Sequence, residues 1–167
     1  TFPNVTTSNN QLLIRYGTSL ATASWSEHLI VLPSGLYGLR ELNDSIEREL
    51  EQSNTTDLIG FNAVQFLPDN ATGKAVLRLS LESVPTGGAL ALVADFSDSR
   101  STIGTLLGFD ANVRMIVQDI TNRDVFEGTS IAKLAPVSSL MLHCSAARGS
   151  IVNGQVGGDV IASIPLD

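Results

Sequence analysis

Apolar and polar residues alternate in short segments along most of the chain, and turn-forming residues separate these segments. In the segment 74–82, leucines at every second position alternate with Arg78 and Ser80, which is typical of a strand with one buried and one solvent-facing side. The segment 89–96 is almost wholly apolar and indicates a strand covered on both faces. The other segments with strand character are Gln11–Tyr16, Leu20–Trp25, His28–Leu32, Phe61–Leu67, Val113–Asp119, Asp124–Glu127, Ser139–Ala146 and Val160–Ile164.

One segment has the periodicity of a helix instead. Between Leu39 and Gln52, apolar residues stand at positions 39, 42, 46 and 50, and charged residues occupy the other faces. This spacing predicts an amphipathic helix that turns one apolar stripe inward. A second, short helix is expected at about 101–107, with Asp98 as its N-terminal cap and Gly108 as the left-handed residue that ends it.

The segments and turns together predict the fold class. About eight or nine strands, joined mostly by short turns rather than helices, favour antiparallel sheets in a sandwich with helical insertions. No repeat of fixed period and no compositional break divides the chain, so we expect a single domain over residues 1–167. A chain of 167 residues buries well over half of its unfolded surface and needs no disulfide or metal to stabilise it.

Composition adds an argument for assembly. Hydrophobic residues make up 43% of the chain and charged residues 16%, whereas about 25% charged residues is usual in soluble domains. So few charges suggest that part of the exterior is buried against other subunits; the alternative is a monomer whose surface is rich in Ser, Thr and Asn. The net charge of −7 and the scattered basic residues argue against direct nucleic-acid binding, and no apolar run is long enough for a membrane span.

The clearest candidate for chemistry is Asp95, Ser97 and Ser99, whose spacing matches the D-x-S-x-S pattern by which some adhesion domains hold a divalent cation. In those domains the strand opens a long α/β chain, whereas about 70 mostly β residues follow here. We therefore expect a loop with a helix cap at this position, and no metal site.

The remaining reactive side chains are few. His28 and His143 are the only histidines, and neither has a carboxylate or a second histidine at ligand spacing. Cys144, the single cysteine, adjoins His143 in an expected strand, where adjacent side chains point to opposite faces. We expect Cys144 to be a buried thiol, and we expect no catalytic residue, cofactor or enzymatic activity.

Glycan binding is an alternative. Trp25, Tyr16 and Tyr37 could form a platform for sugar stacking, although core or interface positions suit these aromatic residues better. Three glycosylation acceptor patterns, a number close to the chance expectation for a chain rich in Ser and Thr, begin at Asn4, Asn54 and Asn70.

Several segments, taken in order, carry a family resemblance. They are Ile30–Tyr37, a helix that bears Asn43, Leu106–Phe109, Leu140–Ser145 and Val160–Pro165. This order resembles the jelly-roll minor capsid proteins, including penton-like ones, of adenovirus-like double-stranded DNA viruses and their virophage and Polinton relatives. The resemblance covers most of the chain, from about Gln11 to Asp167.

The resemblance implies an architecture and an assembly but no catalytic residue. It implies an eight-stranded jelly roll that packs beside copies of itself and beside other capsid proteins in a virion shell assembled inside the host cell. The expected function is that of a minor capsid or penton-like vertex protein forming a homo-oligomeric ring, with a pentamer expected. The acidic charge balance favours an outer or vertex position. The rival functions are a glycan-binding adhesion or spike β-sandwich and an enzyme whose site is assembled only in the fold.

Overall fold

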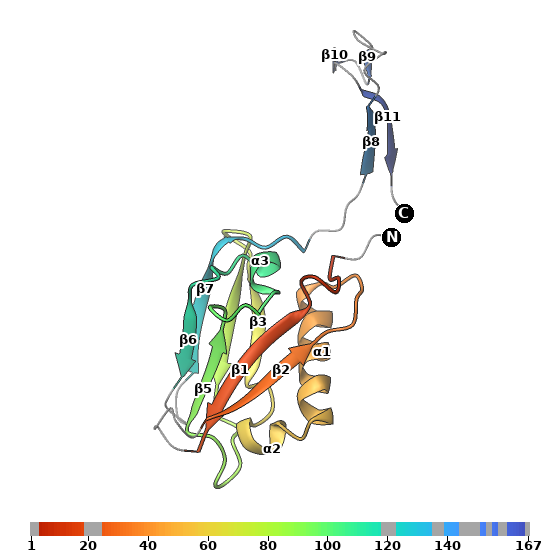
Figure 1. The fold of residues 1–167 in the computed structure, drawn as a ribbon. Helices are drawn as coiled ribbons and strands as arrows, with labels where there is room; N and C mark the ends of the chain where they lie inside the picture. Colours follow the sequence, from red (N-terminus) through yellow and green to blue (C-terminus); the bar gives the residue numbers. More distant parts are fainter. Residues whose placement is uncertain are drawn as a thin grey trace. The chain divides into compact units, whose positions relative to one another are not determined.

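Figure 1 shows the computed structural model of the chain. It describes residues 4–18, 25–117 and 123–134, together with the backbone of the strand segments 139–143, 151–152, 155–156 and 160–165. The chain forms two compact units, one of Pro3–Ala135 and one of Thr1–Phe2 with Pro136–Asp167. The expectation of one domain over residues 1–167 stays a prediction.

The first unit contains two antiparallel sheets. Four strands lie in the order β2-β1-β5-β6 and three in the order β3-β4-β7. The prediction of a mainly β chain with antiparallel pairing is therefore confirmed. The strands are β1 (Gln11–Gly17), β2 (Ser26–Val31), β3 (Val64–Asp69), β4 (Lys74–Ser80), β5 (Ala91–Asp95), β6 (Arg114–Val117) and β7 (Arg123–Ile131).

The alternation of residue types places the core. In β4 the leucines at 77 and 79 are fully buried, whereas Arg78 between them is only half-buried. All five residues of β5 are buried, as the apolar segment 89–96 predicts. Phe109 stacks on Phe96 with ring centroids 4.9 Å apart and lies 5.9 Å from Phe66, which joins residues of both sheets in one core.

The helix α1 (Leu39–Gln52) has the predicted bounds. Leu42, Ile46 and Leu50 are fully buried, and the helix packs on β3 and β2 (Figure 1). At its start, a carboxylate oxygen of Glu41 accepts a hydrogen bond from the Gly38 amide at 3.1 Å. The apolar stripe thus forms part of the core, and polar side chains hold the helix end.

Asn43 joins α1 to the outer edge of β3. Its carboxamide nitrogen donates to the Phe66 carbonyl and its oxygen accepts from the Phe66 amide, both at 2.8 Å. β3 is an edge strand of the three-stranded sheet, so these backbone groups would otherwise offer a pairing site to another strand. Asn43 therefore pairs with the backbone of β3 as a neighbouring strand would.

The second helix differs from its prediction. The helix α3 is Gly104–Leu107, shorter than the expected 101–107, and its N-terminal cap is Ile103 rather than Asp98. The reason is that residues 101–103 are bonded to β1: the Ile103 amide donates to the carbonyl of Gln11 at 3.0 Å. Gly108 is left-handed (φ 80°) as predicted, and a side chain there would meet the Ser130 carbonyl.

Two further elements were not predicted with these bounds. The strand β7 spans nine residues rather than the four of Asp124–Glu127, because its pairing with β4 runs from Arg123 to Ile131. A one-turn helix, α2 (Thr56–Ile59), follows α1. The expected strand Leu20–Trp25 lies outside the described residues apart from its last residue.

The second unit has two antiparallel pairs. β8 (Ser139–His143) pairs with β11 (Val160–Pro165), with a register shift between Val160 and Ala162. β9 (Ile151–Val152) pairs with β10 (Gln155–Val156). The predicted strands at 139–146 and 160–164 are thus found over most of their length.

The buried stripe of α1 yields a stability prediction. Replacing Ile46 with Ala should lower the free energy of unfolding by about 2–5 kcal/mol, because Ile46 is fully buried and the change leaves a cavity. Chemical denaturation measures this loss. Glu51→Gln, at an exposed position of the same helix, is the control and should change stability by less than about 0.5 kcal/mol; equal midpoints for the two variants would contradict the inward face.

The edge contact of Asn43 yields a second prediction. Asn43→Ala should destabilise the chain by about 1–3 kcal/mol, because the Phe66 amide and carbonyl lose their partners. Thermal unfolding gives the measurement, with Gln52→Ala at an exposed position of the same helix as the control. If both variants unfold at the temperature of the wild type, the bidentate contact contributes nothing.

Candidate functional site

The largest cluster of charged side chains lies on the outer face of the four-stranded sheet. Arg15 of β1 is opposite Glu27 of β2, and Asp95 of β5 is opposite Arg114 of β6. These residues share a face because directly paired residues of antiparallel strands point to the same side. The loop after β5 adds Asp98 and Arg100, so the cluster holds three arginines and three carboxylates.

Asp95 is the buried member, with 2% of its side chain exposed. One carboxylate oxygen accepts from the Arg15 guanidinium and, at 3.2 Å, from Arg114. The other accepts from the Ser97 amide at 3.0 Å and from the Ser97 hydroxyl. A buried carboxylate is tolerated when it is paired and hydrogen-bonded, and loss of a partner typically costs about 3–5 kcal/mol.

Asp98 and Glu27 complete the cluster nearer the solvent. The Arg100 guanidinium and the Arg100 amide hold the pKa of Asp98 well below its usual range. Hydrogen bonds from Arg15 and then Arg100 lower the pKa of Glu27. Both carboxylates are therefore ionised at neutral pH and paired with arginines. Asp98 thus stabilises the loop that follows β5 instead of capping a helix.

This geometry leaves no place for a cation at the D-x-S-x-S motif. Asp95 and Ser97 lie together, but two arginines occupy the side where a metal would bind, and Ser99 is exposed. No group of three or more potential metal ligands occurs among the described residues. Sequence spacing could not find Arg15 and Arg114, because only strand pairing brings them to Asp95.

The histidines do not form a reactive site with other described residues. His28 lies 3.4 Å from the Ser53 hydroxyl, and burial lowers the pKa of its ring. The backbone of His143 belongs to β8, whereas Cys144 lies outside the described residues.

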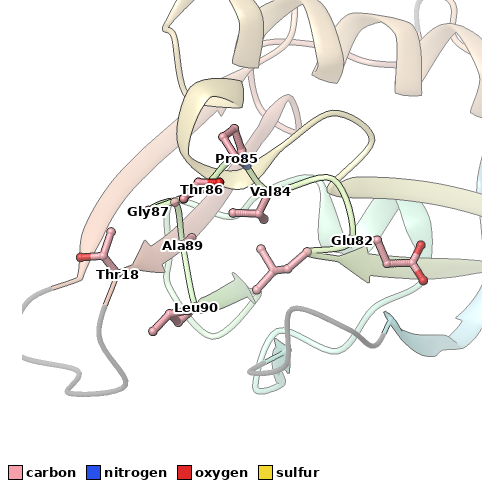
Figure 2. A pocket seen from close by; sticks show the side chains of 10 residues that line it. Thr18, Glu82, Val84, Pro85, Thr86, Gly87, Ala89 and Leu90 are labelled. Atoms are coloured by element: carbon pink, nitrogen blue, oxygen red, sulfur yellow. The ribbon is translucent and has the colours of Figure 1, made fainter.

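A pocket of about 460 Å³ lies between the segment 81–90 and Thr18. Figure 2 shows that aliphatic side chains such as Val84 and Leu90 line it, and that Thr18 and Glu82 stand on opposite sides. Among the described residues that line it, Glu82 is the only ionisable one. General acid–base chemistry needs converging titratable groups, which this lining does not supply.

The aromatic residues of the glycan alternative are separated in the fold. Tyr16 pairs with Ser26 at one end of the β1–β2 ladder, next to Trp25, whereas Tyr37 follows the other end. Five residues along a strand span roughly 17 Å, so the three rings form no common platform. Of the glycosylation patterns, Asn54 and Asn70 are exposed, and the Asn4 carboxamide is bonded to the Tyr37 backbone.

No protein-family model, curated protein or solved structure matches this chain. Among the described residues, no helix has the length and apolar character needed to cross a membrane.

The ion-pair cluster yields a prediction about cations. A cation bound only by the folded state would raise stability by about 2.7 kcal/mol at a hundredfold excess over its dissociation constant. Because arginines surround Asp95, we expect no rise in melting temperature with millimolar magnesium, manganese or calcium. Titration calorimetry, repeated on Asp95→Ala and on the exposed control Asp57→Asn, completes the test. Micromolar binding lost only in Asp95→Ala would contradict this account.

Proposed function

We propose that this chain is a virion structural protein, a minor capsid or penton-like vertex protein that self-associates into a ring within an icosahedral shell. The observation that carries the proposal is a pair of antiparallel sheets around one core, combined with segments that resemble capsid proteins of this class. Such sandwiches serve as building blocks because their faces and edges are available for packing beside copies.

The residues behind the resemblance have structural tasks, which supports a structural role. Asn43 pairs with the edge of β3, and Gly35 bridges to Val5. Gly108 makes a left-handed turn against Ser130. None of these contacts requires a ligand, so we propose an assembly function rather than an enzymatic one.

The eight-stranded jelly roll is the finer part of the proposal. The described strands of the first unit number four and three in the two sheets, one short of two sheets of four. The acidic charge balance fits a place in the outer shell or at a vertex, where the protein contacts itself and other capsid proteins without touching the genome.

Native mass spectrometry of the purified chain tests the assembly. We expect a closed homo-oligomer, with a pentamer as the main species, and a contact of more than roughly 1,000 Å² between copies. A strictly monomeric chain at high concentration, together with no large interface in an assembled particle, would contradict the proposal.

A further inference from the structure

The pocket beside the segment 81–90 is a cavity that the proposed assembly function leaves unused. Its volume of about 460 Å³ lies within the range of about 300–1,000 Å³ that is usual for small-molecule sites. Such sites combine a mostly apolar lining with a few polar groups that fix the orientation of the ligand. The lining drawn in Figure 2 has this composition.

Backbone hydrogen bonds hold the segment that lines this pocket. The Leu90 amide donates to the Gly17 carbonyl at 2.8 Å, and the Ala89 amide donates to the Leu58 carbonyl at 2.7 Å. A side chain at Gly88 would meet the same Leu58 carbonyl, so only glycine lets the segment come this close to α2. The segment is thus tied to both β1 and α2, and the pocket is formed without a ligand, as small-molecule sites usually are.

The side chains of the lining favour a neutral, apolar ligand. Leu90 is 39% exposed, and an apolar ligand would remove such aliphatic surface from water. The negative charge of Glu82 and the net charge of −7 disfavour a carboxylate or phosphate. Glu82 already has a partner within the chain, so it offers no free counter-charge to a cation.

We propose that this pocket binds a neutral aliphatic molecule that carries one hydroxyl or carbonyl group. Its hydrocarbon part lies against Val84 and Leu90, and its polar group lies against the hydroxyl of Thr18. A threonine hydroxyl both donates and accepts, so it suits either polar group. The inference goes beyond the proposed assembly and does not depend on it.

Solution NMR of the full chain tests the site with three six-carbon probes, 1-hexanol, hexylamine and hexanoate. 1-Hexanol should bind saturably, with a dissociation constant of about 1 mM or below. It should shift the amide signals of Val84 and Leu90 and the indole signal of Trp25, whose ring lies beside Gly17. Hexanoate should bind at least tenfold more weakly, and hexylamine no more tightly than 1-hexanol.

Two variants locate the binding. Leu90→Asp introduces a charge into the lining and should weaken 1-hexanol binding at least tenfold. Thr86→Trp, at an exposed position of the lining, fills the pocket and should have the same effect. Val125→Asp, a matched change at an exposed apolar residue of β7, is the control and should bind 1-hexanol as the wild type does. Circular dichroism melts verify that each variant is folded.

The outcomes that would overturn the site are distinct from those that bear on the ring. The absence of saturable shifts up to the solubility limit of 1-hexanol would overturn it, as would an affinity that Leu90→Asp and Thr86→Trp both leave unchanged. Tighter binding of hexylamine, or equal binding of hexanoate, would overturn the neutral ligand class. The titration does not measure assembly, so its failure leaves the proposed ring standing, and a monomeric chain leaves this site standing.

Discussion

The packing of α1 against the two sheets is the constraint on which the rest of the first unit depends. Leu42, Ile46 and Leu50 fill the core from the side of β3, and this brings Asn43 to the backbone of Phe66. A sandwich of open sheets has edges that other chains can extend. The helix removes one such edge while it contributes to the core, so core packing and edge protection come from the same element.

The two outer sheet faces differ in how their charges are satisfied. On the four-stranded sheet, Asp95 is enclosed by Arg15 and Arg114, and the cluster has equal numbers of arginines and carboxylates. That face is complete within one copy. On the three-stranded sheet, Lys74 of β4 and Glu127 of β7 form a single ion pair at 2.9 Å, and Val125 and Ile131 of β7 are exposed. The second face therefore keeps apolar side chains in contact with water.

Sequence reasoning succeeded where local pattern determines structure. The spacing of apolar residues predicts both ends of α1, and alternation identifies β4. Gly108 ends α3 in the left-handed conformation that was expected of it. It was wrong where tertiary contacts decide. Asp98 is a residue type that often caps helices, but its carboxylate accepts hydrogen bonds from Arg100. Backbone pairing with Gln11 keeps residues 101–103 out of the helix.

The candidate site shows the same limit. The spacing of Asp95, Ser97 and Ser99 is visible in the sequence, but the arginines that decide its chemistry are not near in sequence; Arg15 is 80 residues away. Alternation places Arg78 outside the core, yet only the strand register shows that Gln65 of β3 and Val125 of β7 lie beside it.

Hydroxyl-radical footprinting of the wild-type chain, at dilutions below and above assembly, tests most directly that this protein is a self-associating building block. The account predicts that assembly protects exposed apolar side chains, such as those of Val125, Ile131, Phe61 or Leu90, because the core of an interface between copies is apolar. Unchanged reactivity of all these side chains at every concentration would contradict it.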